Sequence, residues 1–355
     1  MKLSFPSVLV PVAAALVAIA FKALNVPAAW FFGPLAVSAL FAICSWHETG
    51  VPRPLYLAAQ AVIGTALGAG IGQGSLETFA GHLVTFVLSV ASLLLISVLN
   101  AWILFRCTRL DAATALLGSL PGSATEMAAM CDSLRADARL VTVMQSLRVL
   151  LIVACLALVT PILSGLGSQA ANHEPPISAP VFAATFEWWK LGILVILAYI
   201  GWLAGTKTRI PAGTLLIPAV LYFILQVCGV ELGRLPWPVT AVAYLVAGLS
   251  VGGRFRRSTI LAAKQMLLPV FATTLLLFGT SFILAYVIVR QTGLDAVSGF
   301  LATTPGILES VGAVAAEMQA DSAVILSVHI LRLACVVIAA PWLVRAAQKW
   351  LVKPS

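Results

Sequence analysis

The chain has 355 residues, of which 61% are hydrophobic and only 10% charged, whereas about a quarter of the residues of a soluble domain carry charge. Apolar runs of roughly 15 to 25 residues recur along it, which excludes a soluble body with one membrane anchor. The runs are apolar on every face, which excludes a β-barrel. The net charge of +8 comes from basic residues in short loops, without the basic patch of a nucleic-acid-binding protein. We expect an all-α polytopic membrane protein that binds no nucleic acid.

Apolar segments follow one another along the chain with short loops between them. In the first half they are expected at residues 5–22, 27–44, 55–72, 82–105 and 138–164, with an interrupted segment at 111–134. In the second half they are expected at 187–205, 211–229, 237–253, 260–289 and 321–347, with an interrupted segment at 295–318. Each half is thus predicted to contain the same six elements.

The two halves are similar in sequence. Adding 184 to a residue number superposes them without a gap, and the matched pairs include Leu110 with Leu294, Pro121 with Pro305, Asp137 with Asp321 and Arg148 with Arg332. This pattern predicts a tandem duplication, with a first membrane repeat at 1–164, a linker at 165–186 and a second repeat at 187–355. The first apolar segment corresponds to residues 191–205 inside the chain, so we interpret it as a helix rather than a signal peptide.

The interrupted segments contain Pro121-Gly122 and Pro305-Gly306. Proline removes an amide donor and disfavours the helical conformation of the residue before it, so the pair predicts a break. Each arm would be about 15 to 18 Å long at 1.5 Å per residue, which is half of a roughly 30 Å hydrocarbon core. The segment could cross the membrane with a break or return as a hairpin.

Loop charge distinguishes these two topologies. If both interrupted segments return as hairpins, the 19 Lys and Arg residues of the loops divide 15 to 4 between the two sides; if all segments cross, they divide 10 to 9. The majority side contains Lys2, Arg53, Arg106, Arg109, Arg135, Arg139, Lys207, Arg209, Arg254, Arg256, Arg257, Lys264, Arg345, Lys349 and Lys353. By the positive-inside rule this side is the cytoplasm and holds both termini. Five crossings per half then give two halves of inverted orientation, the pattern of secondary transporters.

The two breaks are the candidate substrate site, since irregular backbone at membrane depth is tolerated beside a cavity or protein partners. The arms that start at Gly122 and Gly306 would point amide donors and a positive dipole end at the break, which favours an anion. The alternative is that Pro-Gly only kinks a packed helix. The break residues and their hydroxyl neighbours are Ser119, Pro121, Gly122, Ser123 and Thr125, and Thr303, Thr304, Pro305, Gly306 and Ser310.

Two arginines, Arg148 and Arg332, lie about ten residues into apolar helices. A charge at that depth costs roughly 2.5 to 3.5 kcal/mol on insertion scales. Either both face a cavity and hold an anionic substrate, or each is neutralised by a hairpin carboxylate; the candidates are Glu126, Glu309 and Glu317. One turn earlier on the same face lie Gln145 and His329. Either His329 or Glu126 could carry a coupled proton.

Other conspicuous residues have structural interpretations. Asp111, Asp137 and Asp321 are expected to cap helices. The glycine series Gly64, Gly68, Gly72 and Gly248, Gly252 is expected to permit close helix packing. Six isolated cysteines and four scattered histidines predict neither a disulfide framework nor a metal site, and no cofactor is expected.

A paired signature extends over both halves: Leu-Pro-Gly-Ser-x-x-Glu-Met at 120–127 with Ala136-Asp137 and Leu147-Arg148, and Thr-Pro-Gly at 304–306 with Ala320-Asp321 and Leu331-Arg332. It resembles the AbrB-type duplicated membrane protein family over essentially the whole chain. That family is unrelated to the soluble DNA-binding regulator of the same name. The resemblance implies a fold similar to inverted-repeat cation/proton antiporters and anion transporters, while members are labelled as ammonia monooxygenases or regulators of gene expression. The second half departs from the signature at Val311.

Three classes of function follow. A secondary transporter of a small, anionic solute accounts for the duplication, the breaks and the buried arginines together. A membrane-embedded regulator or sensor that affects gene expression indirectly is the alternative. A monooxygenase would need a metal cluster that the dispersed histidines do not supply. We expect no enzymatic activity and a multi-pass protein of a bacterial inner membrane. Its partners would be a small-molecule or ion substrate and the lipid bilayer, and the sequence leaves homo-oligomer formation open.

Overall fold

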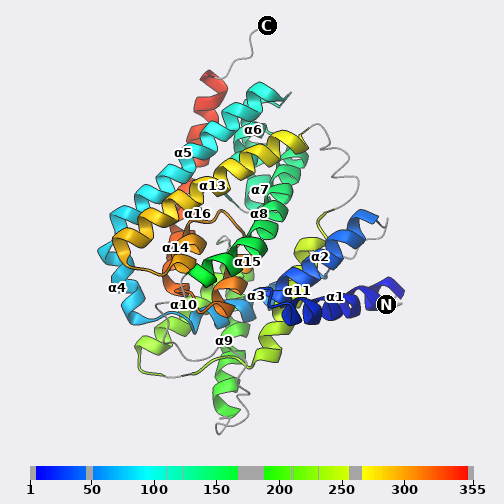
Figure 1. Ribbon diagram of the computed structural model, residues 1–355, viewed down its shortest axis with the longest axis vertical. Coiled ribbons are helices and arrows are strands. Elements are labelled where there is room, and N and C mark those ends of the chain that lie inside the picture. Colours follow the sequence, from blue (N-terminus) through cyan, green and yellow to red (C-terminus); the bar gives the residue numbers. More distant parts are fainter. Residues whose placement is uncertain are drawn as a thin grey trace. The chain divides into compact units, whose positions relative to one another are not determined.

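The structure is a computed structural model that describes residues 5–44, 51–108, 110–122, 124–166, 188–208, 210, 212–230, 232–255 and 266–350. Every regular element of these residues is an α-helix (Figure 1). Five of the helices are long and apolar enough to cross a membrane, namely α5 Leu83–Cys107, α8 Ala138–Leu166, α9 Trp188–Lys207, α13 Leu267–Thr292 and α16 Ser322–Trp350. The chain is therefore an all-helical protein of the membrane type, as its composition predicts.

The chain divides into two compact units, and each takes helices from both halves of the sequence. Unit 1 comprises Met1–Glu77, Ala157–Arg257 and Glu309–Ala323. Unit 2 comprises Thr78–Leu156, Ser258–Leu308 and Val324–Ser355. The units differ from the repeats predicted at 1–164 and 187–355, because a compact unit is defined by spatial contacts and a repeat by sequence similarity.

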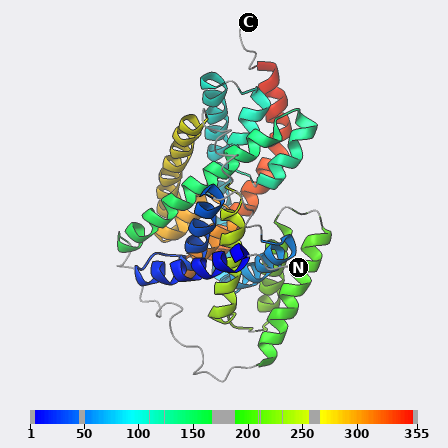
Figure 2. The same ribbon diagram turned by 90° about the vertical axis from the view of Figure 1, so that its right-hand side faces the viewer.

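Unit 1 is built on the first three helices of each half. These are α1 Phe5–Ala23, α2 Ala29–Cys44 and α3 Arg53–Gly68 from the first half, and α9, α10 Gly213–Val227 and α11 Trp237–Gly252 from the second. Helix α1 lies beside α2 in both views (Figures 1 and 2). Helix α3 packs on α9 and α10, whereas α11 packs on α2 and α3. The unit also contains nearly all of α15 Leu308–Glu317.

Glycines bring the backbones of these helices together. A Cβ atom on Gly64 would lie 2.0 Å from the Leu215 carbonyl oxygen, and one on Gly248 would lie 2.4 Å from the Phe31 carbonyl oxygen. No side chain fits at such distances, so α3 approaches α10, and α11 approaches α2, only because both positions are glycine. The same holds for Gly68 and Gly252, which face Tyr222 and Ser38. The packing role predicted for these four glycines is confirmed, but Gly72 meets only the Ser75 hydroxyl, at 3.4 Å.

In its described residues unit 2 contains the long helices α5 and α13, most of α8 and nearly all of α16, together with short helices. The short helices are α4 Gln73–Gly81, which begins in unit 1, α6 Ala112–Ser119, α7 Ala124–Leu134 and α14 Ala296–Thr303. Helix α5 packs on α6 and α13, and α13 packs on α14. Apolar side chains of α6 and α7, including Leu116, Leu120 and Met127, form one core with Val336 and Ala340 of α16.

Aspartates begin several of these helices. Asp111 accepts hydrogen bonds from the backbone amide of Thr114 at 2.9 Å and from its hydroxyl at 2.6 Å, which caps α6. Asp137 accepts from the amides of Arg139 and Leu140 at the start of α8, and Asp321 accepts from Ala323 at the start of α16. The three predicted caps are confirmed.

Some predicted boundaries are wrong. The segment expected at 55–72 ends at Gly68, and the separate helix α4 follows it at Gln73–Gly81. The second arms begin at Ala124 and Leu308 rather than at Gly122 and Gly306. The amide of Gly122 instead donates to the Leu120 carbonyl at 2.9 Å. This amide is therefore not directed at a ligand, contrary to the expectation for the first arm.

Candidate functional site

The helices on either side of Pro121 and Pro305 are short. Helix α6 ends at Ser119 and α7 begins at Ala124; α14 ends at Thr303 and α15 begins at Leu308. Leu120 and Thr304, which precede the prolines, have extended backbones with ψ of 137° and 128°. A proline disfavours the helical conformation of its predecessor. The last carbonyls of α6 and α14 therefore have no intrahelical partner and must be satisfied by other donors.

Arg148 of α8 supplies such donors to the first break. Its guanidinium donates to the carbonyl oxygens of Ser119 at 3.1 Å, Leu120 at 2.8 Å and Gly122 at 3.3 Å. The same group donates to the side-chain oxygen of Gln145. Arg148 is 4% exposed, so these contacts replace the water that the guanidinium would otherwise bind.

Arg332 of α16 makes the corresponding contacts at the second break. It donates to the carbonyl oxygens of Thr304 at 2.8 Å and Gly306 at 3.4 Å, and it is 5% exposed. Thr304 and Gly306 are 184 positions after Leu120 and Gly122, as Arg332 is after Arg148. Both buried arginines thus cap the carboxyl end of a short helix, where the helix dipole favours a cation.

The partners described for the two guanidinium groups are main-chain carbonyls and one amide oxygen. Among the described side chains no carboxylate pairs with either guanidinium, and the side chain of Glu126, one of the predicted carboxylates, is not described. Carbonyl oxygens are neutral, however, so they satisfy donors without cancelling charge. The candidate site therefore carries two buried positive charges on uncharged partners.

The neighbours of the arginines differ between the breaks. Gln145 donates to the carbonyl oxygens of Leu117 at 2.9 Å and Leu120 at 3.0 Å, which ties α8 to the end of α6. His329 is bonded through Nδ1 to the Ile325 carbonyl of its own helix at 2.9 Å. Its buried Nε2 atom has no hydrogen-bond partner among the described residues. At the second break the end of α14 is instead held by Ser281 of α13, whose hydroxyl donates to the Thr303 carbonyl at 3.3 Å.

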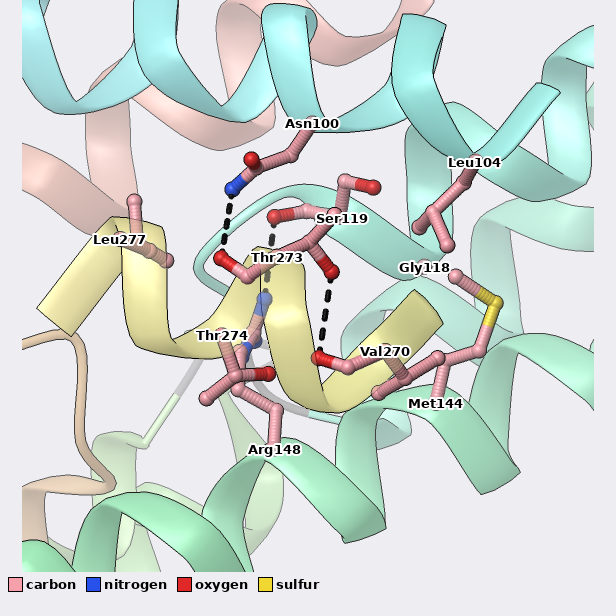
Figure 3. A pocket seen from close by; sticks show the side chains of 10 residues that line it. All are labelled: Asn100, Leu104, Gly118, Ser119, Met144, Arg148, Val270, Thr273, Thr274 and Leu277. Carbon is pink, nitrogen blue, oxygen red and sulfur yellow. Dashed lines mark hydrogen bonds between the residues drawn. The ribbon is translucent and has the colours of Figure 1, made fainter. Parts of the chain in front are cut away.

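A small cavity borders the first break (Figure 3). Its volume of about 10 Å³ is about the space of one water molecule. Two buried polar atoms beside it, Oδ1 of Asn100 and Nε of Arg148, have no partner among the described residues, while the Asn100 amide donates to the Thr273 carbonyl at 3.0 Å. The lining residues are Asn100, Leu104, Gly118, Ser119, Met144, Arg148, Val270, Thr273, Thr274 and Leu277. An acceptor and a charged donor thus meet at the same cavity.

The hydroxyl groups predicted at the breaks bond mainly to nearby backbone. The Ser119 hydroxyl donates to the Ala115 carbonyl at 2.8 Å, and that of Thr304 donates to the Phe300 carbonyl at 2.7 Å. The Thr303 hydroxyl reaches the Ser281 carbonyl of α13 at 2.9 Å. These groups stabilise helix ends in this structure. Pro121, Pro305 and Ser310 are buried.

Three predicted residues lie outside the described side chains. Ser123 is not described, and neither are the side chains of Thr125 and Glu126, although α7 includes both positions.

Glu309 belongs to unit 1, where it contacts residues that the sequence analysis missed. It accepts hydrogen bonds from Tyr56 at 2.7 Å and Gln60 at 2.6 Å, both on α3. Glu317 accepts from the Ala28 amide and lies 3.8 Å from the ammonium of Lys22, so it too is engaged within unit 1. The sequence feature that could have indicated Gln60, and likewise Asn100, is an amide side chain inside an apolar run. Nothing in the sequence indicated that Tyr56 and Glu309, 253 positions apart, would meet.

Known proteins resemble this chain over nearly its whole length. The family described as "Transition state regulatory protein AbrB" matches residues 2–79 and 47–348. A relative in Escherichia coli (strain K12), named "Putative regulator AbrB", is 31% identical over 348 residues, which are 96% of each chain. The "Uncharacterized protein YhjN" of Bacillus subtilis (strain 168) is 22% identical over 328 residues, covering 88% of this chain and 85% of that protein. The protein described here belongs to the AbrB family.

Proposed function

We propose that the protein is a secondary transporter of a small organic anion in a bacterial inner membrane, with both termini in the cytoplasm. The observation that carries this proposal is the pair of buried arginines, Arg148 and Arg332, whose described partners are all uncharged.

The distribution of charge within unit 2 supports an anionic solute. The described carboxylates Asp111 and Asp295 cap α6 and α14, and Asp137 caps α8. Among the described side chains none forms an ion pair with either arginine, and such an unpaired charge costs roughly 2.5 to 3.5 kcal/mol in an apolar environment on insertion scales. A bound carboxylate or similar anion would offset that cost with charge-assisted hydrogen bonds. The unpartnered Nε of Arg148 is a donor available for such a bond.

The helix boundaries support two homologous halves. The bounds of α3, α6 and α8 become those of α11, α14 and α16 when 184 is added. The glycine crossings are reciprocal in the same numbering, because Gly64 meets Leu215 while Gly248 meets Phe31. If a two-fold axis relates two halves, each contact between them occurs a second time with the halves exchanged. The loop charges favour the inverted form of that relation, which is common among transporters.

The lengths of the short helices support re-entrant hairpins. Helices α6 and α14 have 8 residues each, and α7 and α15 have 11 and 10. At 1.5 Å per residue they are about 12 to 17 Å long, about half of the hydrocarbon core. Paired half-helices around a central site are the elements with which such transporters alternate access.

The test is a thermal-shift screen of the purified protein against small organic anions, followed by uptake of each hit in proteoliposomes. Arg148→Gln and Arg332→Gln should each lower the affinity for the anion at least tenfold and abolish its uptake, since the removed charge is buried. Arg106→Gln is the matched control, because Arg106 is exposed and stacks on Trp102. If both buried variants transport normally, the anion site is elsewhere.

A membrane regulator remains the alternative, and the name of the Escherichia coli relative favours it. The same experiment separates the two. A regulator would bind the anion with the same dependence on Arg148 and Arg332, yet sealed proteoliposomes would show no flux.

A further inference from the structure

A second buried polar cluster lies in unit 1. It consists of Tyr56 and Gln60 on α3, Thr214 on α10 and Glu309 in the first turn of α15. Gln60, Thr214 and Glu309 are buried, and Tyr56 is half-buried. A carboxyl group buried among neutral residues is expensive to ionise unless its surroundings are arranged for it, so its partners indicate what it binds.

The hydrogen bonds of the cluster all run toward the carboxylate. The Tyr56 hydroxyl and the Gln60 amide both donate to Oε1 of Glu309, at 2.7 Å and 2.6 Å. The Thr214 hydroxyl donates to the side-chain oxygen of Gln60 at 2.5 Å. Reversing the Gln60 amide would direct its oxygen at Glu309 and its NH2 group at Thr214. Gln60 also donates to the Tyr56 hydroxyl at 3.0 Å, so its three bonds together favour the orientation that donates to the carboxylate.

This polarity disfavours a metal cation. Sodium, calcium and magnesium need several oxygen lone pairs that converge on one point. Here Tyr56 and Gln60 point hydrogen atoms at the carboxylate, and the lone pairs of Gln60 are turned toward Thr214. A proton needs only one carboxylate oxygen, so it is the cation that this arrangement can accept.

The charged groups around Glu309 in unit 1 are few. On the side of α11, the guanidinium of the exposed Arg254 lies 5.5 Å from the centre of the Tyr56 ring. Helix α10 contributes only the neutral Thr214, and Tyr56 is the titratable group from α3. Further along α15, Glu317 is engaged by Ala28 and Lys22. Among the described residues of unit 1, no Lys or Arg forms an ion pair with Glu309, so no fixed cation of these residues occupies the carboxylate.

We propose that Glu309 is the binding site of the coupling ion, a proton, and that Tyr56 links it to the surface marked by Arg254. This inference rests on the proposed transport function. A proton taken from water on one side forms an O–H bond with the Glu309 carboxylate. The same bond breaks when the proton is released to water on the other side, so no oxidant or second reactant is needed. A proton carried with an anion also cancels the charge that crosses the membrane.

The first readout does not depend on transport. Infrared difference spectra of the full-length protein, recorded on acidification, should contain a protonated-carboxyl band that disappears in Glu309→Gln and persists in Glu317→Gln, the control on the same helix. Tyr56→Phe should shift the band to higher wavenumber, because the carboxyl group loses one donor while the acid itself remains. This variant identifies the band even if Glu309→Gln does not fold. A band that is unchanged in both Glu309→Gln and Tyr56→Phe overturns the proposal.

The second readout is coupling in proteoliposomes, with an anion from the screen as the probe. Glu309→Gln should lose accumulation driven by a proton gradient at least tenfold and retain anion exchange without a gradient, whereas Glu317→Gln should retain both. Accumulation at the wild-type level in Glu309→Gln overturns the proposal. If the wild-type protein moves no anion, the transport function fails, and the infrared band alone decides whether Glu309 takes the proton.

Discussion

The two helix breaks share one scaffold but differ in what surrounds it. Arg148 and Arg332 cap the ends of α6 and α14 with corresponding carbonyl contacts. At the first break Gln145 adds two bonds, at 2.9 Å and 3.0 Å, to the same helix end. At the second break His329 bonds to its own helix, and Ser281 adds one longer bond, at 3.3 Å, to the Thr303 carbonyl. The break-capping arginine is thus the common element, and the neighbouring residue sets how firmly the break is held. We interpret the second break as the more mobile of the two.

The largest expected effect comes from replacing each arginine by lysine. Lysine keeps the charge but lacks the planar fork that reaches several carbonyls at once. Arg148→Lys should destabilise the protein by about 2 to 4 kcal/mol and Arg332→Lys by about half as much, since hydrogen bonds of charged groups contribute about 1.5 to 3 kcal/mol each. Unfolding temperatures of the purified variants measure this, with the exposed Arg106→Lys as the control.

Equal losses of stability in Arg148→Lys and Arg332→Lys would contradict the proposed difference between the two breaks, because the described contacts of Arg332 are fewer. A loss in Arg106→Lys of similar size would mean that the measurement reports arginine content rather than the capped breaks.

The sequence predicted the residues of the breaks better than their partners. Burial of Arg148 and Arg332, capping by Asp111 and close packing at Gly64 follow from local rules, because depth in an apolar run, helix starts and small-residue spacing are visible along the chain. The partners of Arg148 are not, since carbonyls carry no sequence signal and lie 26 to 29 positions away.

Partners that are distant from each other in the sequence were harder still to predict. The sequence offered Glu309 as a ligand or as a neutralising acid, and only the packing of α3 against α10 placed Gln60 beside Thr214. The sequence also predicted that Ser119, Thr303 and Thr304 bind a ligand. In this structure their hydroxyls donate to backbone carbonyls. Short polar side chains next to helix ends compete for those carbonyls, and spacing alone does not decide the outcome.

An intermediate effect is expected from exchanging the second residues of the breaks. Gln145→His removes two bonds from the end of α6 and should lower stability by about 1 to 2 kcal/mol. His329→Gln should do the opposite, because an amide there can donate to the carbonyls of α14 as Gln145 does to those of α6. We expect a higher unfolding temperature and slower anion uptake in His329→Gln.

If the second break is the more mobile of the two, His329→Gln must raise the unfolding temperature. If His329→Gln is less stable than the wild-type protein, or transports faster, then His329 itself supports the second break and the difference between the breaks is not one of rigidity.

The smallest effect concerns Asn100, a further polar difference between the breaks. The position 184 residues later is Leu284, so Asn100→Leu makes the first break resemble the second. The change removes the bond to the Thr273 carbonyl and also the unpartnered Oδ1. The substitution loses the stabilisation of one hydrogen bond but also removes the cost of burying an oxygen without a partner. These two free energies nearly cancel, so the free energy of unfolding should change by under about 1 kcal/mol. Anion affinity should change only a few-fold, because Arg148 retains its charge. A tenfold or greater loss of affinity, with stability unchanged, would instead make Asn100 a direct contact of the anion and place the solute next to the small cavity of Figure 3.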